Sequence, residues 1–457
     1  MAENSQKNKT SIYKPKPVSG FPEWLPEERL VEQRWYDHIR RIFESYGFCS
    51  IETPSVEEID VLLAKGEVDK EIYVLERLHK EEEDSKDARL ALHFDQTVPF
   101  ARYTAQHFND LVFPFKRYQM QRVWRGERPQ MGRMREFTQC DIDIINVDNL
   151  PLAFDAEIPA VIYEVLDGLN IGRVQLRISN RKILSGFLED WGIEDIPAVL
   201  RVLDKAEKLN DTEFFTELNK VCYRQGSIIK GDWTAVRILM ELVKTKASTS
   251  KELRKKIFEA EYGALTPTYL EGIEELCDVL DNLSHLPEHA VVADLSIVRG
   301  LDYYTGTVYE TQLLDVPEFT GSVCSGGRYD DLASQYINKK LPGVGISIGF
   351  SRLFDVIRQS RPDLMKIGPK SPTDILLYTE ETSLAGVANT TAQTLRQRGL
   401  NVDHYHTVKK WDKHYKYAEK KQIPYIWYVK GENAHEVKIM ESGAQQSADP
   451  KTWEKPA

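Results

Sequence analysis

Four arginines, Arg125, Arg128, Arg133 and Arg135, lie within eleven residues of one another, with Glu127 among them. Arginine presents a planar set of donors that matches the oxygens of a phosphate group. A loop needs fewer charges than this to stay soluble. The cluster therefore predicts a site for an anion of the phosphate type.

The segments that flank these arginines, 115–124 and 136–145, are typical of β-strands, which places the arginines at the tip of a hairpin. Successive side chains of a strand point to opposite faces of the sheet. The apolar face of the second strand should pack on the core, and its polar face then floors a pocket; a surface strand would give a similar pattern. The polar face carries Phe137, Gln139, Asp141 and Asp143, and the apolar face carries Thr138, Cys140, Ile142 and Ile144.

A carboxylate and a hydroxyl stand two residues apart at Asp95 and Thr97, before a helix predicted over 98–107. In an extended chain both side chains project to one side, where both can accept hydrogen bonds from an ammonium group. The alternative, in which Thr97 is the N-cap of the helix, fits the sequence about equally well.

Arg299 and the adjacent tyrosines Tyr303 and Tyr304 lie in a segment that contains Gly300 and Gly306 and leads into a predicted strand. Glycines let the backbone turn sharply. An arginine beside phenol hydroxyls suits an anionic, polar small molecule. The alternative is a surface hairpin in which the tyrosines serve packing.

Two glycine-rich stretches follow. Gly326 and Gly327 precede Tyr329 and permit close approach of the backbone to a ligand. The stretch 341–353 resembles a dinucleotide-binding fingerprint only superficially, because its glycine spacing is one residue too long and no strand precedes it. A buried strand over 344–348 followed by a helix from Ser351 fits better. Arg352 then lies on the first helical turn. It either contributes to a binding site, which the neighbouring strand of small residues favours, or is exposed to solvent.

Residues 409–421 carry six lysines and two acids, with Trp411 and two tyrosines between them. Nucleic-acid bases can stack on such rings while lysines contact phosphates. The alternative is a solvated, lysine-rich helix. After a Gly/Pro linker at 368–372, the surrounding segment alternates strand, helix and strand at 374–378, 384–398 and 425–429, which predicts a small α/β domain.

Other segments position these residues. Apolar residues at helical spacing predict a helix over 22–46, which Gly47 ends, and a short strand over 48–52. A charged excursion over 76–89 is typical of a solvated loop. Residues 182–287 are helical and highly charged and hold no catalytic constellation, which predicts a helical insertion packed on itself.

The composition is that of a soluble globular protein of two to four domains, with 457 residues, 41% hydrophobic and 29% charged. No apolar run is long enough to span a bilayer, so no membrane partner is expected. Residues 1–20 are polar and are predicted to be a disordered tail. Five scattered cysteines indicate the reducing cytoplasm. The net charge of -11 argues only weakly against a nucleic-acid partner, because local basic patches can hold a large RNA.

Together and in this order, these motifs resemble those of the histidyl-tRNA synthetase family of class II aminoacyl-tRNA synthetases. The resemblance covers nearly everything after Gly20 and depends most on 124–137, 298–310, 323–330 and 341–353. It implies an α+β fold in which an antiparallel sheet is flanked by helices. The catalytic domain would be split into 21–181 and 288–366 around the helical insertion at 182–287. An α/β anticodon-binding domain would follow at 367–457, and the N-terminal helix-strand-proline unit would form a homodimer interface.

The resemblance also implies a reaction. L-Histidine is activated with ATP to histidyl-adenylate, and the histidyl group is then passed to the 3′ end of tRNA(His). Mg²⁺ would neutralise the outer phosphates, although no metal ligand can be assigned from the sequence. Arg125 and Arg299 would be catalytic and flank the α-phosphate. The implied ATP-binding residues are Arg125, Glu127, Arg133, Phe137 and Arg352; the histidine-binding residues are Asp95, Thr97, Gln139, Asp143, Arg299, Tyr303, Tyr304 and Tyr329; and the tRNA-binding residues are Arg128, Gln130, Lys409, Lys410 and Trp411.

Some positions depart from the family pattern. Asp95 and Asp143 stand where bacterial members usually have Glu, as in eukaryote-type members, which keeps the carboxylate and shortens its reach. Trp411 and Asp412 replace residues that are often small or basic, so anticodon contacts there stay open. A non-catalytic relative, the regulatory subunit of histidine biosynthesis, has the same fold but typically lacks the C-terminal domain and catalytic arginines. This chain has both.

Overall fold

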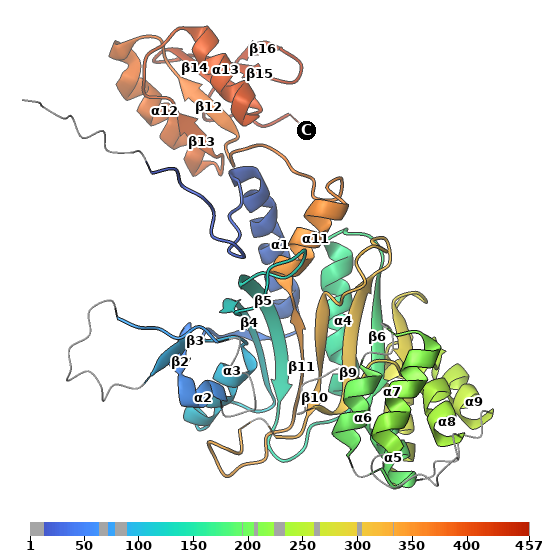
Figure 1. The fold of residues 1–457 in the computed structure, drawn as a ribbon. Coiled ribbons are helices and arrows are strands. Elements are labelled where there is room, and N and C mark those ends of the chain that lie inside the picture. The colour runs from blue at the N-terminus through green and yellow to red at the C-terminus, as the bar shows by residue number, and fades with distance from the viewer. Residues whose placement is uncertain are drawn as a thin grey trace, which may run out of the picture. The chain divides into compact units, whose positions relative to one another are not determined.

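The computed structural model describes residues 13–63, 72–77, 89–193, 195–204, 209–223, 234–259, 266–298, 304–331 and 333–456. The chain divides into two compact units (Figure 1). The first comprises Met1–Glu23 with His38–Leu364, and the second comprises Trp24–Asp37 with Met365–Ala457. Among the helices of the described ranges, none is both long and apolar enough to cross a membrane.

Nine of the described strands form one sheet in the first unit, in the order β1-β4-β5-β11-β10-β9-β6-β8-β7. Neighbouring strands are antiparallel except for the pairs β1/β4 and β6/β8. The predicted α+β fold with an antiparallel sheet is therefore confirmed. The strands are β1 (Cys49–Ser50), β4 (Phe115–Trp124), β5 (Glu136–Ile145), β6 (Val174–Asn180), β7 (Lys246–Ala247), β8 (Val291–Asp294), β9 (Tyr304–Leu313), β10 (Cys324–Tyr329) and β11 (Gly343–Ile348).

The hairpin β4–β5 has the predicted bounds, and its apolar face is buried as expected. Cys140, Ile142 and Ile144 are fully buried. Two helices cover this face of the sheet, α4 (Ala153–Gly168) and α11 (Phe350–Ser360). The backbone N–H of Thr138 donates to Oγ of Ser351 on α11 at 2.8 Å, which ties the hairpin to that helix.

The N-terminal helix α1 spans Pro26–Ser45 and ends before Gly47, whose φ of 80° requires glycine. The strand predicted over 48–52 is shorter, because only β1 has strand geometry; beyond it, the N–H of Ile51 still donates to the carbonyl of Tyr118. The charged excursion over 76–89 lies mostly outside the described residues. Four elements follow β1 around that gap: β2 (Val56–Glu58), α2 (Ile59–Leu63), β3 (Leu90–Leu92) and α3 (Thr97–Gln106).

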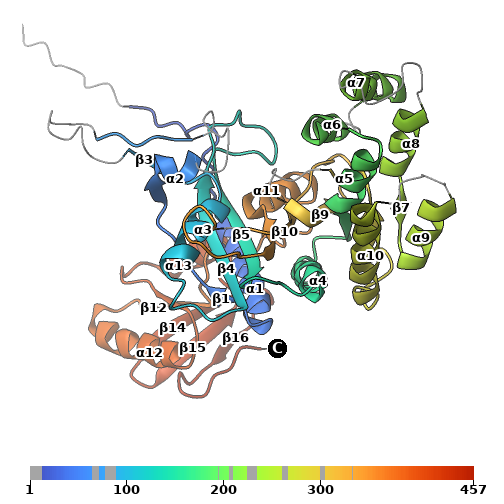
Figure 2. The same cartoon turned by 90° about the horizontal axis from the view of Figure 1, so that it is seen from below.

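The predicted insertion is helical, but it is not packed only on itself. Helices α5 and α10 contact each other and also strands β6 and β9, and β7 pairs with β8 at the edge of the sheet. Their apolar faces are buried against the sheet, which explains the difference. Figure 2 shows α6 to α9 gathered beside this edge. The helices are α5 (Arg181–Asp190), α6 (Ile196–Leu203), α7 (Asp211–Tyr223), α8 (Thr234–Val243), α9 (Ser250–Glu259) and α10 (Pro267–Asn282).

The second unit contains a five-stranded sheet of described strands in the order β13-β12-β14-β15-β16. Its first three strands are parallel and the others antiparallel. The predicted α/β alternation is therefore present, although β13, β15 and β16 were not expected. The elements are β12 (Ile375–Tyr378), the 3₁₀ turn η3 (Thr382–Leu384), α12 (Ala385–Gln397), β13 (Val402–His404), α13 (Trp411–Lys421), β14 (Tyr425–Gly431), β15 (Ala434–Ile439) and β16 (Gln445–Ser447).

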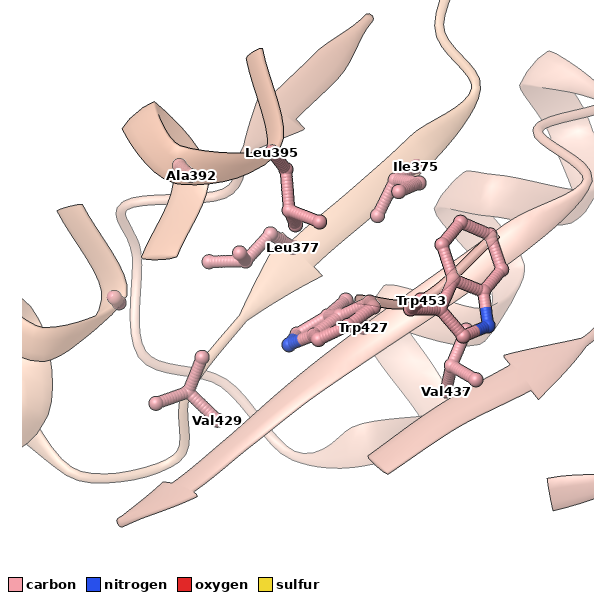
Figure 3. Packing of buried hydrophobic residues seen from close by; sticks show 9 residues of the cluster. Ile375, Leu377, Ala392, Leu395, Trp427, Val429, Val437 and Trp453 are labelled. Atoms are coloured by element: carbon pink, nitrogen blue, oxygen red, sulfur yellow. The ribbon is translucent and has the colours of Figure 1, made fainter. Parts of the chain in front are cut away.

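Trp427 on β14 is the centre of the core of this unit (Figure 3). Its side chain is fully buried and meets the ring of Trp453 edge-on, with the ring centroids 5.7 Å apart. Ile375 and Leu377 of β12 complete the same cluster. Burial of large aromatic surfaces is the main stabilising contribution in a unit of this size.

We expect Trp427→Ala to destabilise this unit by about 3–5 kcal/mol, because a large cavity would replace the indole ring. The measurement is differential scanning calorimetry of the full chain. Trp411→Ala is the matched control: Trp411 is 39% exposed, and its loss should cost no more than about 1 kcal/mol. Equal shifts of the melting temperature for the two variants would contradict this assignment of the core.

Candidate functional site

The polar face of β5 lies in the middle of the large sheet, between β4 and β11. Residues directly opposite each other on paired antiparallel strands point to the same face. The register places Arg117 of β4 opposite Asp143, and Gln119 opposite Asp141. On the other side, β11 places Gly345 opposite Asp143 and Ser347 opposite Asp141. Three strands therefore build one polar floor.

Arg117 and Asp143 form a buried ion pair on this floor. Arg117 is fully buried, and its Nη2 lies 2.5 Å from Oδ2 of Asp143. The guanidinium carbon also lies 4.2 Å from the centroid of the Phe100 ring. The second oxygen of Asp143 accepts a hydrogen bond from the hydroxyl of Tyr329 at 3.0 Å. Burial raises the pKa of Tyr329 well above its ordinary value, so this hydroxyl stays protonated and donates.

The glycines of β11 make room for these side chains. A Cβ atom on Gly345 would overlap the carboxylate of Asp143, and one on Gly343 would overlap the ring of Tyr329. The stretch 341–353 is thus a strand followed by a helix, as predicted, and its glycines open the sheet to neighbouring side chains. At Gly326 the sheet itself requires glycine, because a Cβ atom there would strike the backbone of Gly345 and Ile346 on β11; close approach of a ligand stays a prediction.

Asp141 is the second carboxylate of the floor. Ser347 donates a hydrogen bond to it, and Nε2 of Gln139 donates to Oγ of the same serine at 2.7 Å. Burial raises the pKa of Asp141 to about 7; the charge of Arg117 opposes this rise, and the charges of Asp143 and Asp95 add to it. Two acids and one arginine on the floor, with Asp95 near them, favour a cationic ligand.

Asp95 and Thr97 do not form the expected extended pair. Thr97 is the first residue of helix α3, and Oδ1 of the buried Asp95 accepts a hydrogen bond from the N–H of Val98 at 3.1 Å. The alternative of Thr97 as N-cap is also wrong, since Gln96 occupies that position without a side-chain cap. Asp95 itself satisfies the helix terminus, because a carboxylate is the best local acceptor for the free N–H groups there.

All five predicted ATP-binding residues line one cleft beside the polar floor. Gln139 and Ser347 line the same cleft, so the floor and the cleft are continuous. The lining residues come from the hairpin loop, β5, β11, the start of α11, and β10 with the segment before it. The five predicted residues are Arg125, Glu127, Arg133, Phe137 and Arg352.

The cleft is electropositive. Glu127 lies 3.8 Å from both Arg125 and Arg133, so one carboxylate faces two guanidinium groups. Arg352 adds a third, held by hydrogen bonds from Nε to the carbonyl of Gly132 at 2.8 Å and from Nη1 to that of Ser322 at 3.0 Å. An excess of arginine charge in a concave site suits a polyphosphate.

An aromatic ring flanks these charges. The guanidinium of Arg125 lies over the Phe137 ring, 5.2 Å from its centroid, and its Nε donates to the carbonyl of Phe94 at 3.0 Å. Phe137 is partly exposed at the head of the polar face. A planar heterocycle can stack on such a ring.

Two predicted site residues, Arg299 and Tyr303, lie outside the described residues. Tyr304 begins β9 and stands opposite Tyr329 of β10, so it reaches the same face of the sheet. Arg128 and Gln130 are exposed in the hairpin loop, where Gln130 and Arg133 close a turn through N–H to carbonyl hydrogen bonds of 3.1 and 2.8 Å.

The basic patch of the second unit begins at α13. Lys410 is the N-cap of this helix, and Lys409 and Lys410 are exposed. The ring of Trp411 stacks on that of Tyr415 at 5.0 Å, and Nζ of Lys438 lies over both rings. A solvated helix and a base-stacking surface are both compatible with this arrangement.

Sequence reasoning missed Arg117 and Ser347, and it gave Asp141 no role. Each was visible as a residue of a predicted strand. The in-register pairing of the hairpin was the available signal for Arg117, because a ten-residue strand that pairs in full aligns it with Asp143. Ser347 needed the pairing of β5 with β11, which are about two hundred residues apart.

Mg²⁺ fits the cleft only if the phosphates of a bound substrate supply some of the oxygens that coordinate the ion. Within the described ranges no group of three or more His, Cys, Asp or Glu side chains could hold a metal ion. Among the described lining residues only Glu127 carries a carboxylate. Mg²⁺ commonly takes one or two carboxylates together with substrate phosphates, so Glu127 is the residue suited to hold it.

Comparisons with known proteins show the family of the chain. The histidyl-tRNA synthetase family model matches residues 20–353. Histidine–tRNA ligase of Thermobifida fusca is 52% identical over 445 residues, covering 97% of this chain and 98% of the relative. That of Micrococcus luteus is 43% identical, covering 96% of each. The chain therefore belongs to the histidyl-tRNA synthetase family.

Solved structures show the same fold. Histidyl-tRNA synthetase from Nostoc sp. PCC 7120 superposes with a TM-score of 0.83 at 36% identity, covering 95% of this chain and 97% of that one. An ATP phosphoribosyltransferase regulatory subunit/histidyl-tRNA synthetase from Bacillus halodurans C has a TM-score of 0.71 at 19% identity, with 92% and 100% covered. At that identity the second likeness concerns the fold alone.

The buried ion pair yields a stability prediction. Arg117→Met and Asp143→Asn should each destabilise the first unit by about 3–5 kcal/mol, because each leaves a buried charge without its partner. The double variant should cost less than the sum of the two, since it removes both charges. Calorimetric melting of the three variants measures this, and strictly additive losses would contradict a coupled pair.

Proposed function

We propose that this chain is a histidine–tRNA ligase, which activates L-histidine with ATP and transfers the histidyl group to tRNA(His). One observation carries the proposal: five arginine, glutamate and phenylalanine residues converge on a cleft that is continuous with an acidic, polar sheet floor. The cationic cleft suits ATP, and the acidic floor suits the ammonium and imidazole groups of histidine. The family membership supports the same activity.

ATP is assigned to the cleft. Phe137 stacks on adenine, Arg125 holds the α-phosphate, and Arg133 and Arg352 hold the outer phosphates. Glu127 would hold Mg²⁺ together with the phosphates, and the ion would supply additional positive charge to them. Fixed cations at the reacting phosphate lower the barrier because they need no reorganisation as charge shifts.

Histidine is assigned to the floor. Asp143 accepts a hydrogen bond from the imidazole ring. Tyr329 and Arg117 hold the carboxylate of Asp143 in place. Asp95, Thr97 and Gln139 accept from the α-ammonium group. Tyr303 and Tyr304 complete the proposed pocket. The histidine carboxylate then attacks the α-phosphate, and pyrophosphate leaves.

The tRNA is assigned to two surfaces. Arg128 and Gln130 at the hairpin tip contact the acceptor end, and Lys409, Lys410 and Trp411 contact the anticodon region. The catalytic domain at 21–181 and 288–366, the insertion at 182–287 and the anticodon-binding domain at 367–457 follow the division proposed from the sequence. We also propose a homodimer formed through the N-terminal helix and strand, and a cytoplasmic location.

The regulatory subunit of histidine biosynthesis remains the alternative. It would bind histidine without activating it. ATP–pyrophosphate exchange with each of the twenty amino acids separates the two functions. Exchange that depends on histidine alone supports the ligase; histidine binding without exchange supports the regulator, and exchange with another amino acid contradicts both.

Arg299 gives the kinetic prediction. If it meets the α-phosphate, Arg299→Ala should lower the kcat of adenylation by roughly 10²–10³, the range for one preorganised donor, with little change in affinity for histidine or ATP. Arg299→Lys should recover only part, because a point charge cannot copy the two-pronged guanidinium. Transfer from preformed adenylate to tRNA should suffer less.

Pre-steady-state kinetics separates the two steps. Equal damage to adenylation and transfer, or a loss of affinity with kcat intact, would show that Arg299 shapes the pocket and does not stabilise the transition state of adenylation.

A further inference from the structure

Ser347 links two side chains of the polar floor. Its Oγ accepts a hydrogen bond from Nε2 of Gln139 at 2.7 Å, and its proton is donated to Asp141. Asp141 is buried in the middle of the floor, and within the described part of the chain its Oδ1 has no hydrogen-bond partner.

This arrangement fixes which end of the Gln139 amide faces the serine. Above its pKa of about 7 the Asp141 carboxylate is ionised and can only accept, so Ser347 must then give it its single proton. The serine oxygen is then left as an acceptor, and the NH₂ group of Gln139 is the part of that side chain that can donate to it. The two ends of an amide differ only in this chemistry.

The other end of the amide is left for a ligand. Oε1 of Gln139 is buried, and no described residue donates to it. A buried acceptor without a donor is costly, so such an atom in a binding cleft indicates a group that a ligand satisfies. Gln139 lines the cleft together with Ser347.

We propose that Asp141 is a positioning residue, which acts through Ser347 to hold the Gln139 amide with its oxygen toward the ammonium group of histidine. This proposal depends on the proposed function, because it explains how the proposed histidine site recognises the ammonium group of histidine. Asp141 itself does not touch the ligand.

The burial of the Asp141 carboxylate is the second observation in favour of this proposal. Burial raises the pKa of Asp141 to about 7; the charge of Arg117 and the hydrogen bond from Ser347 oppose this rise, and the carboxylates of Asp143 and Asp95 add to it. A raised pKa means that ionised Asp141 costs folding free energy as the pH rises from about 4 toward 7 and above. Asparagine has almost the same shape and avoids this cost. A carboxylate kept at a destabilising position indicates a functional need for it.

Asp141→Asn is the central test. The NH₂ group of asparagine can donate to Ser347, whose proton can then turn to Oε1 of Gln139. The Gln139 amide would rotate and present its NH₂ group to the ammonium group. We expect the KM for histidine in pyrophosphate exchange to rise roughly 10- to 100-fold, as for the loss of one hydrogen bond to a charged group. The KM for ATP should change less than twofold.

An analogue tests the orientation directly. The compound 3-(imidazol-4-yl)propionate lacks the ammonium group and should inhibit the wild type and Asp141→Asn with similar affinity. Ser347→Ala should weaken histidine in the same direction as Asp141→Asn. Asp110→Asn is the matched control, because Asp110 is 81% exposed and its variant should behave as wild type.

A double-mutant cycle separates positioning from direct contact. In a Gln139→Ala background, Asp141→Asn should cause no further rise in the histidine KM. The melting temperature of Asp141→Asn at pH 8 should equal or exceed that of the wild type, which excludes misfolding as the cause.

The outcomes are distinct. Three results would overturn the role of Asp141 and leave the proposed histidine site intact. They are a full effect of Asp141→Asn in the Gln139→Ala background, an unchanged histidine KM in Asp141→Asn alone, and a lower melting temperature of that variant at pH 8. An unchanged histidine KM in Gln139→Ala overturns the proposed histidine site and this proposal with it.

Discussion

A buried ion pair, Arg117 with Asp143, is the constraint on which the polar floor depends. A guanidinium without solvent must have a charged partner, and a carboxylate beside it must be held at hydrogen-bond distance. The pairing register of β4 and β5 provides this contact, because it places Arg117 and Asp143 opposite each other. Gly345 on β11 then leaves the space that the carboxylate occupies. The position of Tyr329 follows, because Gly343 leaves space for its ring in the same way.

The site joins two regions of opposite charge. The cleft collects Arg125, Arg133 and Arg352 around one glutamate, whereas the floor collects Asp141 and Asp143 around one buried arginine. A phosphate chain is drawn to the first and an ammonium group to the second. The boundary between them, at Gln139 and Ser347, is where the carboxylate of a bound amino acid would meet the α-phosphate. Placing two reactants at one boundary is itself a large part of catalysis.

Local patterns in the sequence predicted the hairpin and its two faces, because strand alternation and arginine clustering are visible within thirty residues. The set of cleft residues was implied by the resemblance to the family. Partners distant in the chain were not predictable. The helix cap at Asp95 and the strands β7 and β13 are too short or too context-dependent for periodicity to show them. The structural need for glycine at Gly326 was not predictable for the same reason, since it comes from the neighbouring strand β11. Arg299 and Tyr303 lie outside the described residues, and their roles stay predictions.

The most direct test of the histidine site is to add one methyl group at Gly345. Gly345→Ala would place a Cβ atom against the carboxylate of Asp143, whereas a Cβ atom on Gly386 would meet nothing within 4 Å. Calorimetric titration of histidine into both variants and the wild type measures the consequence. The account predicts at least roughly tenfold weaker histidine binding for Gly345→Ala, about 1.4 kcal/mol, with unchanged binding for Gly386→Ala and retained ATP binding in both. Histidine affinity equal to wild type in a folded Gly345→Ala protein would contradict the assignment of the floor as the histidine site.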